Sequence, residues 1–272
     1  MKILIITNML NKQVAEDVLI AKSFFEDNNE VAVVNMDYNE SLDEMYDVII
    51  RRNTWYDDES KMKYYYIQTK KLCNRLLNKS VCKINFNGNF DTSNKTYLVD
   101  LFDKGYPVIP SVHNLEDLDK LARTETYMLK PIEGYDGVGQ AKLAKDELIN
   151  KFNENYIIQP VMEFGSEVQF YFVGTKYQYA LEFKPSKVPI YPEPTIYNCS
   201  EEELEIATRF AKLNSQLVGV QRIDFIKLEN GELLLLEIED TAPHLELKSA
   251  SEEAREQFLR DYKNMVYNEV NS

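Results

Sequence analysis

The sequence predicts an α/β protein that begins with a parallel β–α–β unit. The main observation is an apolar run at 2–7, a helical pattern at 14–25 and a second apolar run at 31–34. A strand, a helix and a strand in close succession indicate a parallel sheet. Two further observations place chemistry in the later parts of the chain: a glycine-rich stretch at 130–140 and an acidic strand pair at 218–239.

Composition limits the class of partner. The chain has 272 residues, enough for two or three subdomains. Its 31 basic and 45 acidic residues give a net charge of −14, which argues against nucleic acid or an anionic membrane as main partner, because both need basic patches. The three cysteines form neither a disulfide framework nor a metal motif. No apolar run is long enough for a secretory signal or a membrane span, so we expect a cytoplasmic protein.

The strand expected at 46–50 is followed by Arg51, Arg52 and Trp55, the only tryptophan. Ligands of open parallel sheets bind beyond the carboxyl ends of the strands. These side chains could therefore grip a substrate carboxylate or phosphate. A solvated strand end with a packing tryptophan is the alternative. No G-x-G-x-x-G motif follows the first strand, so we expect no dinucleotide site there.

The glycine-rich stretch begins after Lys130. Three of the nine glycines, Gly134, Gly137 and Gly139, fall within six positions between two strand-like segments. Glycine lets backbone N–H groups approach a phosphate closely, and a lysine adds a positive charge. Taken alone, a surface hairpin explains this stretch equally well.

A hairpin is expected late in the chain. Two strand-like runs, 218–228 and 232–239, flank an Asn-Gly pair at 230–231, the strongest short hairpin signal. A symmetric loop of two or four residues pairs Leu228 with Leu233. A three-residue loop would shift the register by one position and remove the facing pair of acids described next.

In the symmetric register Asp224 faces Glu237 and Arg222 faces Glu239, all on one side of the hairpin because side chains alternate. Opposed carboxylates repel each other, so a cluster of three favours a site for hard cations such as Mg²⁺ bridged to phosphates. Three solvated acids on an exposed sheet face are the alternative. The residues expected to take the opposite, core-facing side are Leu234, Leu236 and Ile238.

The order of these motifs resembles the ATP-grasp superfamily over nearly the whole chain. The similarity is greatest to the RimK-type and glutathione-synthetase-like carboxylate–amine ligases, in the branch that includes the cycloserine-forming cyclo-ligase. That branch shows an Arg-x-x-Trp signature, matched loosely by residues 52–55, and a Glu-x-Glu followed by a Pro-x-Leu, matched by 237–239 and 243–245.

The resemblance implies a parallel β–α–β domain followed by two α+β subdomains that clasp ATP. A pre-ATP-grasp domain would span 1–90, an N-subdomain with the phosphate lysines and glycine loop 91–160, and a C-subdomain with the metal carboxylates 161–272. Glu167 would bind the ribose, with Glu163 as a competitor. The implied nucleotide-binding residues are Lys95, Lys130, Gly134, Gly137, Gly139, Gln159, Pro160, Val161, Met162 and Glu167.

The resemblance also implies that Asp224, Glu237 and Glu239 hold Mg²⁺, with two ions expected. Most relatives have asparagine at the position of Glu239. Arg222 would steady the transferring phosphoryl group, and Lys184 would stand where relatives place a substrate-side arginine. Residues 185–194, with four prolines, would form a loop or lid.

The implied activity is ATP-dependent joining of a carboxylate to an amine through an acyl phosphate, on small-molecule or peptide substrates, with an oligomer possible. One alternative is an ATP-binding regulatory or structural module without turnover, as in synapsin-like relatives. Another is a kinase-like transferase that releases a phosphorylated product. The intact lysines and acids favour a ligase.

Overall fold

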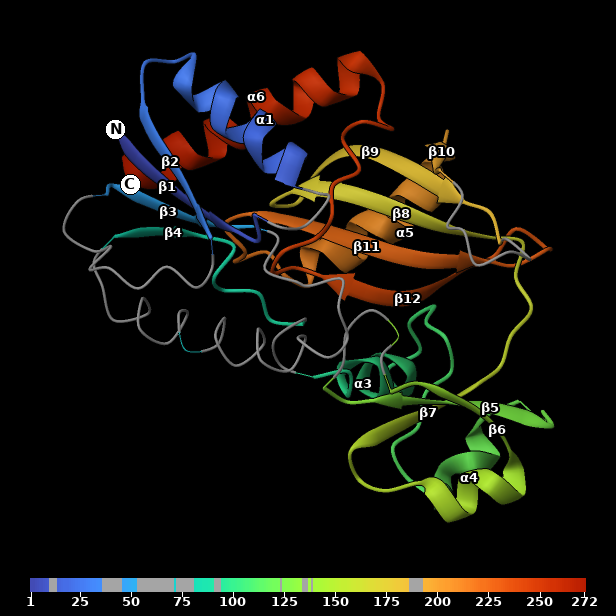
Figure 1. The fold of residues 1–272 in the computed structure, drawn as a ribbon. Helices are drawn as coiled ribbons and strands as arrows, with labels where there is room; N and C mark the ends of the chain where they lie inside the picture. The colour runs from blue at the N-terminus through green and yellow to red at the C-terminus, as the bar shows by residue number, and fades with distance from the viewer. Residues whose placement is uncertain are drawn as a thin grey trace.

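The computed structural model describes residues 1–9, 14–35, 46–52, 71, 81–90, 94–122, 124–133, 137, 139–185 and 193–272. These residues form three β-sheets with helices packed on them (Figure 1). Trp55, Gly134 and most of the proline-rich segment lie outside the described residues. No helix in the described ranges combines the length and the apolar character needed to cross a membrane.

The N-terminal sheet is parallel, with strand order β2-β1-β3-β4. Helix α1 connects β1 to β2, which confirms the predicted β–α–β unit. Buried Ile3, Ile5 and Ile50 line one face of this sheet, and Leu4, Ile6 and Ile49 line the other. Its elements are β1 (Lys2–Thr7), α1 (Val14–Phe25), β2 (Glu30–Asn35), β3 (Val48–Arg51) and β4 (Cys82–Ile84).

The middle of the chain forms a three-stranded antiparallel sheet in the order β6-β5-β7. Strands β5 and β6 flank the glycine-rich stretch, as predicted. Buried Leu129, Leu143 and Ile158 pack with Leu148 of α4. The elements here are α3 (Tyr97–Asp103), the 3₁₀ helix η1 (Leu115–Lys120), β5 (Thr126–Pro131), β6 (Ala141–Ala144), α4 (Lys145–Lys151) and β7 (Tyr156–Pro160).

The C-terminal part forms a five-stranded antiparallel sheet in the order β10-β9-β8-β11-β12. Helix α5 begins with a capping box, in which Ser200 and Glu203 exchange side chain–backbone hydrogen bonds. The elements are β8 (Ser166–Val173), β9 (Lys176–Phe183), β10 (Thr195–Ile196), α5 (Glu201–Lys212), β11 (Val220–Lys227), β12 (Leu233–Glu239) and α6 (Glu252–Val270).

Helices α5 and α6 cover opposite faces of the five-stranded sheet. Phe170 and Phe172 of β8 pack in the same cluster as Phe210 of α5, while Tyr171 packs in the cluster that contains Phe258 of α6. Helix α6 also contacts α1 and β4, and lies beside α1 in Figure 1. The expected first and third domains therefore share one core, although their exact limits stay a prediction.

The turn between β11 and β12 differs from the prediction. It is a three-residue loop, because the amide N–H of Leu228 donates to the carbonyl of Glu232 at 2.9 Å. Lys227, and not Leu228, lies opposite Leu233. The register near the turn is therefore shifted by one residue from the symmetric loop.

A β-bulge reverses this shift before the acids are reached. The register changes between Asp224 and Phe225, leaving Leu236 as the extra residue of β12. Asp224 therefore lies opposite Glu237 and Arg222 opposite Glu239, as predicted.

The bulge also makes the prediction of which β12 side chains face the core partly wrong. Ile238 packs in one cluster with Leu233 and Leu235, whereas Leu234 and Leu236 pack in another. An extra residue in a strand changes which side chains share a face, since side chains alternate with period two.

Candidate active site

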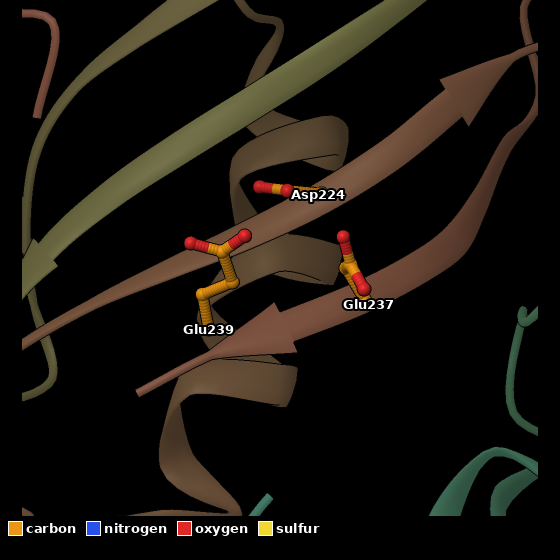
Figure 2. A group of neighbouring side chains, drawn as sticks. All are labelled: Asp224, Glu237 and Glu239. Atoms are coloured by element: carbon orange, nitrogen blue, oxygen red, sulfur yellow. The ribbon is translucent and has the colours of Figure 1, made fainter. Parts of the chain in front are cut away.

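Three carboxylates gather on the β11–β12 hairpin. Asp224 on β11 and Glu237 and Glu239 on β12 approach one another on the same side of the sheet (Figure 2). Each offers an oxygen atom, and these atoms lie within 4.8 Å of one another. The side chain of Asp224 is buried, while those of Glu237 and Glu239 are 33% and 25% exposed. Several convergent carboxylate oxygens are the donor set that Mg²⁺ prefers, so these residues fit that ion.

Arg222 bridges two of these acids. Its Nε and Nη2 donate to the two carboxylate oxygens of Asp224 at 2.8 and 2.7 Å, and Nη2 also donates to Glu239 at 2.7 Å. Burial raises the pKa of Asp224, and the charge and hydrogen bonds of Arg222 oppose this rise. A guanidinium that forms paired hydrogen bonds to a carboxylate offsets the repulsion between neighbouring acids.

Two lysines from the middle of the chain act on the same acids. Lys95 Nζ lies 3.0 Å from Glu237 Oε2. Lys130 on β5 is buried, and this burial lowers its pKa even though the charge of Glu237 acts in the opposite direction. Burial alone would raise the pKa of Glu237, but Lys95 and Lys130 outweigh it and lower the pKa to about 2. Lysines from one part of the fold therefore meet acids from another.

Glu167 lies near this group. It occupies β8, its charge acts on both Lys130 and Asp224, and it accepts a hydrogen bond from Gln169 at 2.8 Å. Its competitor in the prediction, Glu163, is exposed and lines the neighbouring cleft.

That cleft, of about 480 Å³, lies between β7 and the β11–β12 turn. The end of β7 and the segment after it line one wall with Pro160, Val161, Met162 and Glu163. The other lining residues are Pro110, Ala122, Thr124, Leu228, Glu229 and Asn230. The walls are mostly apolar, as expected where a planar base is bound.

Gln159 has a role within the fold, and its predicted role in nucleotide binding stays a prediction. Its side chain is buried and donates to Ser111 Oγ at 2.8 Å, and that hydroxyl donates to the carbonyl of Ile109 at 2.7 Å. These bonds join β7 to the segment 109–111, in which Pro110 also lines the cleft.

The described glycines of the predicted phosphate loop adopt backbone conformations that suit glycine. Gly137 and Gly139 have φ angles of +73° and +77°, in the left-handed region where a Cβ is disfavoured. Lys184 is exposed just after β9. Among the described residues, no hydrogen bond or ion pair joins Lys184 to the acids.

Arg51 and Arg52 lie on opposite faces of the N-terminal sheet, because they are consecutive residues of an extended segment. Arg52 is fully buried; its Nε lies 2.9 Å from Asp17 of α1, and its Nη2 donates to the carbonyl of Pro243 at 3.1 Å. Arg52 therefore has a structural role, joining α1 to the segment after β12. Its predicted role in substrate binding stays a prediction.

Two buried residues, one in the segment after β12 and one beside it, were not predicted to have a role. His244 lies near Arg52 and Arg222, and burial together with these charges lowers its pKa to about 3. Glu16 of α1 accepts the amide N–H groups of Leu245 and Leu247, both at 3.0 Å, and burial raises its pKa to about 6. The Pro-x-Leu motif marked this segment, but nothing in the sequence connected it to α1.

A parallel sheet followed by two α+β parts, with lysines from one and carboxylates from the other converging beside an apolar cleft, is the ATP-grasp architecture. The motif order predicted this fold, and comparison with solved structures confirms it. No protein-family model and no curated protein sequence matches the chain.

Three solved structures illustrate the similarity. The D-cycloserine synthetase DcsG has a TM-score of 0.76 at 16% identity, covering 99% of this chain and 100% of that one. The ATP-grasp ligase PsnB, complexed with a phosphomimetic variant of a minimal precursor, Mg and ADP, has a TM-score of 0.68 at 14% identity, covering 97% and 98%. A D-alanine–D-alanine ligase from Bacillus anthracis complexed with ATP has a TM-score of 0.64 at 13% identity, covering 99% and 97%.

Proposed function

We propose that this protein is an ATP- and Mg²⁺-dependent ligase that joins a carboxylate to an amine. The observation that carries the proposal is the convergence of Lys95 and Lys130 on Glu237. Two lysines beside clustered carboxylates suit a polyphosphate with its metal ions. The similar structures include ligases complexed with ATP or with Mg and ADP.

The proposed nucleotide position follows the cleft. Adenine would lie against the segment from Gln159 to Met162, including Pro160 and Val161, and Glu167 would bind the ribose. The phosphates would extend toward Lys95 and Lys130. The loop with Gly134, Gly137 and Gly139 would cover them and exclude water, which would otherwise hydrolyse a reactive intermediate.

Asp224, Glu237 and Glu239 would hold the metal, with two ions proposed. Bound Mg²⁺ supplies positive charge to the phosphate oxygens. Arg222, held by Asp224 and Glu239, would steady the transferring phosphoryl group. Glu239, where most ATP-grasp relatives have asparagine, adds one negative charge to the set.

The proposed reaction has two steps. The substrate carboxylate attacks the γ-phosphate and forms an acyl phosphate and ADP. The amine then attacks the acyl carbon and releases phosphate. Arg51, Arg52, Trp55 and Lys184 are proposed to face the substrates, which would be small molecules or peptides. The similar structures include a D-cycloserine synthetase and an ATP-grasp ligase complexed with a precursor peptide.

The test is a screen of acids and amines for ADP release, with mass spectrometry of the products. Hydroxylamine added with the acid alone should trap the acyl phosphate as a hydroxamate. Glu237→Gln should bind ATP with little loss but turn over about 100-fold to 1000-fold more slowly, because this carboxylate acts on charge that develops in the transition state. If ATP binds tightly but no acid yields ADP or a hydroxamate, the protein is an ATP-binding module without turnover.

A further inference from the structure

Tyr97 connects helix α3 to the strand that carries two of the acids. Its hydroxyl accepts a hydrogen bond from the amide N–H of Ile238 at 2.8 Å. Ile238 lies between Glu237 and Glu239, and β12 is the last strand of its sheet. At Leu235 the segment 107–109 pairs with the outer side of β12. At Ile238 the N–H group instead takes a side-chain hydroxyl as its acceptor. Tyr97 supplies that acceptor next to both carboxylates.

Lys95 lies two residues before Tyr97, and hydrogen bonds hold both its backbone and its side chain. Its backbone N–H donates to the carbonyl of Ile132 at 3.0 Å, just after the buried Lys130 of β5. Its side chain reaches Glu237 at 3.0 Å. The segment that contains Lys95 and Tyr97 therefore joins the β5 side of the site to the acid-bearing strand.

Asp240, the residue after Glu239, forms a second attachment. Its buried Oδ2 accepts hydrogen bonds from the amide N–H groups of Asn89 and Phe90 at 2.6 and 2.9 Å, and from Asn214 Nδ2 at 2.8 Å. The ring of Phe90 packs edge-on against Tyr97, with the centroids 4.9 Å apart. Tyr97 and residues 89–90 are thus attached at Ile238 and Asp240, the two residues that flank Glu239.

We propose that Tyr97 is a positioning residue that sets the separation between Lys95 and the carboxylates of Glu237 and Glu239, with Asp240 as its second anchor. This inference rests on the proposed function, in which the lysine binds phosphate and the acids hold Mg²⁺. Mg²⁺ demands near-ideal ligand geometry, and binding groups must be held to within about 0.5 Å by the residues that support them. A loose β12 edge would therefore weaken metal binding in the nucleotide complex more than nucleotide binding itself.

The experiment uses Tyr97→Phe, which removes only the hydroxyl. Mn²⁺ serves as the probe, and its binding at saturating ATP is followed by electron paramagnetic resonance. We expect Mn²⁺ to bind about fivefold to tenfold more weakly. Metal-free ATP affinity, measured by calorimetry, should change less than about twofold. The matched control is Tyr267→Phe, which loses hydrogen bonds to Asn29 and Asp27 far from the acids and should leave Mn²⁺ binding unchanged.

The outcomes separate this proposal from the proposed function. A wild-type protein that binds neither ATP nor Mn²⁺ refutes the function, and the positioning role falls with it. A wild-type protein that binds both, with Tyr97→Phe binding Mn²⁺ equally well, overturns the positioning role alone. Equal losses in Tyr97→Phe and Tyr267→Phe overturn it as well, because they indicate general destabilisation. If Tyr97→Phe does not fold, Asp240→Asn carries the same test with the same expected direction.

Discussion

At the scale of single residues, the cations and acids of the site neutralise one another. Lys95 pairs with Glu237, and Arg222 pairs with Asp224 and Glu239. A metal ion that binds without nucleotide must compete with Lys95 for Glu237. The phosphates of ATP would attract Lys95 and free the carboxylate. We therefore infer that nucleotide and metal assist each other in binding.

This exchange predicts opposite effects of one substitution. Lys95→Ala should strengthen binding of Mn²⁺ alone by about fivefold, because a partly exposed ion pair contributes up to about 1 kcal/mol. The same substitution should weaken ATP binding by about tenfold or more, since a charge-assisted hydrogen bond to phosphate is lost. Paramagnetic resonance of Mn²⁺ and calorimetry of ATP measure the two effects.

A control for this substitution is Lys176→Ala, which removes the ion pair between Lys176 of β9 and Asp261 of α6. It should alter neither affinity. If Lys95→Ala weakens or does not change the binding of Mn²⁺ alone, Lys95 does not compete with the metal for Glu237.

At the scale of elements, the β11–β12 hairpin shows what the sequence could and could not predict. Period-two alternation and the Asn-Gly pair predicted a hairpin with Asp224 opposite Glu237, and this pairing is present. It does not arise from the symmetric turn on which the prediction rested, but from a three-residue turn whose shift in register a bulge reverses. The three-residue turn and the bulge were not predicted, because the extra residue falls in the run Leu233–Leu236. Four identical apolar side chains give no change of pattern to mark a bulge, so only the packing of both faces locates it.

The turn itself can be tested at Gly231, which has a φ angle of +87° and open space where a Cβ would be. Gly231→Ala should destabilise the protein by about 1 to 2 kcal/mol, through the left-handed backbone alone. Gly231→Asn should cost clearly less, because asparagine tolerates this region. Urea unfolding of the three proteins measures the difference.

Gly165→Ala is the matched control for the turn, since its nearest non-local neighbour is at an ordinary 3.6 Å and its φ is not positive. Equal costs for alanine and asparagine at Gly231 would show that backbone conformation does not limit this turn.

At the scale of the whole molecule, α6 was not predicted, although its sequence contains the signal. Ser251 caps the helix by accepting the amide N–H of Ala254 at 3.1 Å. Phe258, Tyr262 and Val266 recur every four residues and are buried, the spacing of one helix face. The pattern could have shown the helix, but not that its apolar face packs against both the N-terminal sheet and the five-stranded sheet, since those contacts are far apart in sequence.

This shared core predicts that the N-terminal and C-terminal sheets unfold together. Phe258 is fully buried, and its ring lies 5.8 Å from that of Tyr262 and 6.2 Å from that of Tyr179. Phe258→Ala should therefore destabilise the protein by about 3 to 5 kcal/mol. Native-state hydrogen exchange should show the same loss of protection in β1 and β8, because one cooperative unit opens as a whole.

Phe164→Ala provides the comparison for this substitution, since Phe164 is 37% exposed and its truncation should cost well under half as much as that of Phe258. A loss of protection confined to β1 would contradict the prediction. It would mean that the N-terminal sheet opens on its own, and that α6 stabilises two separately folding units. Equal losses in both sheets would instead mean that a substitution far from the acids changes how often the whole site, including Lys95 and Glu237, is assembled.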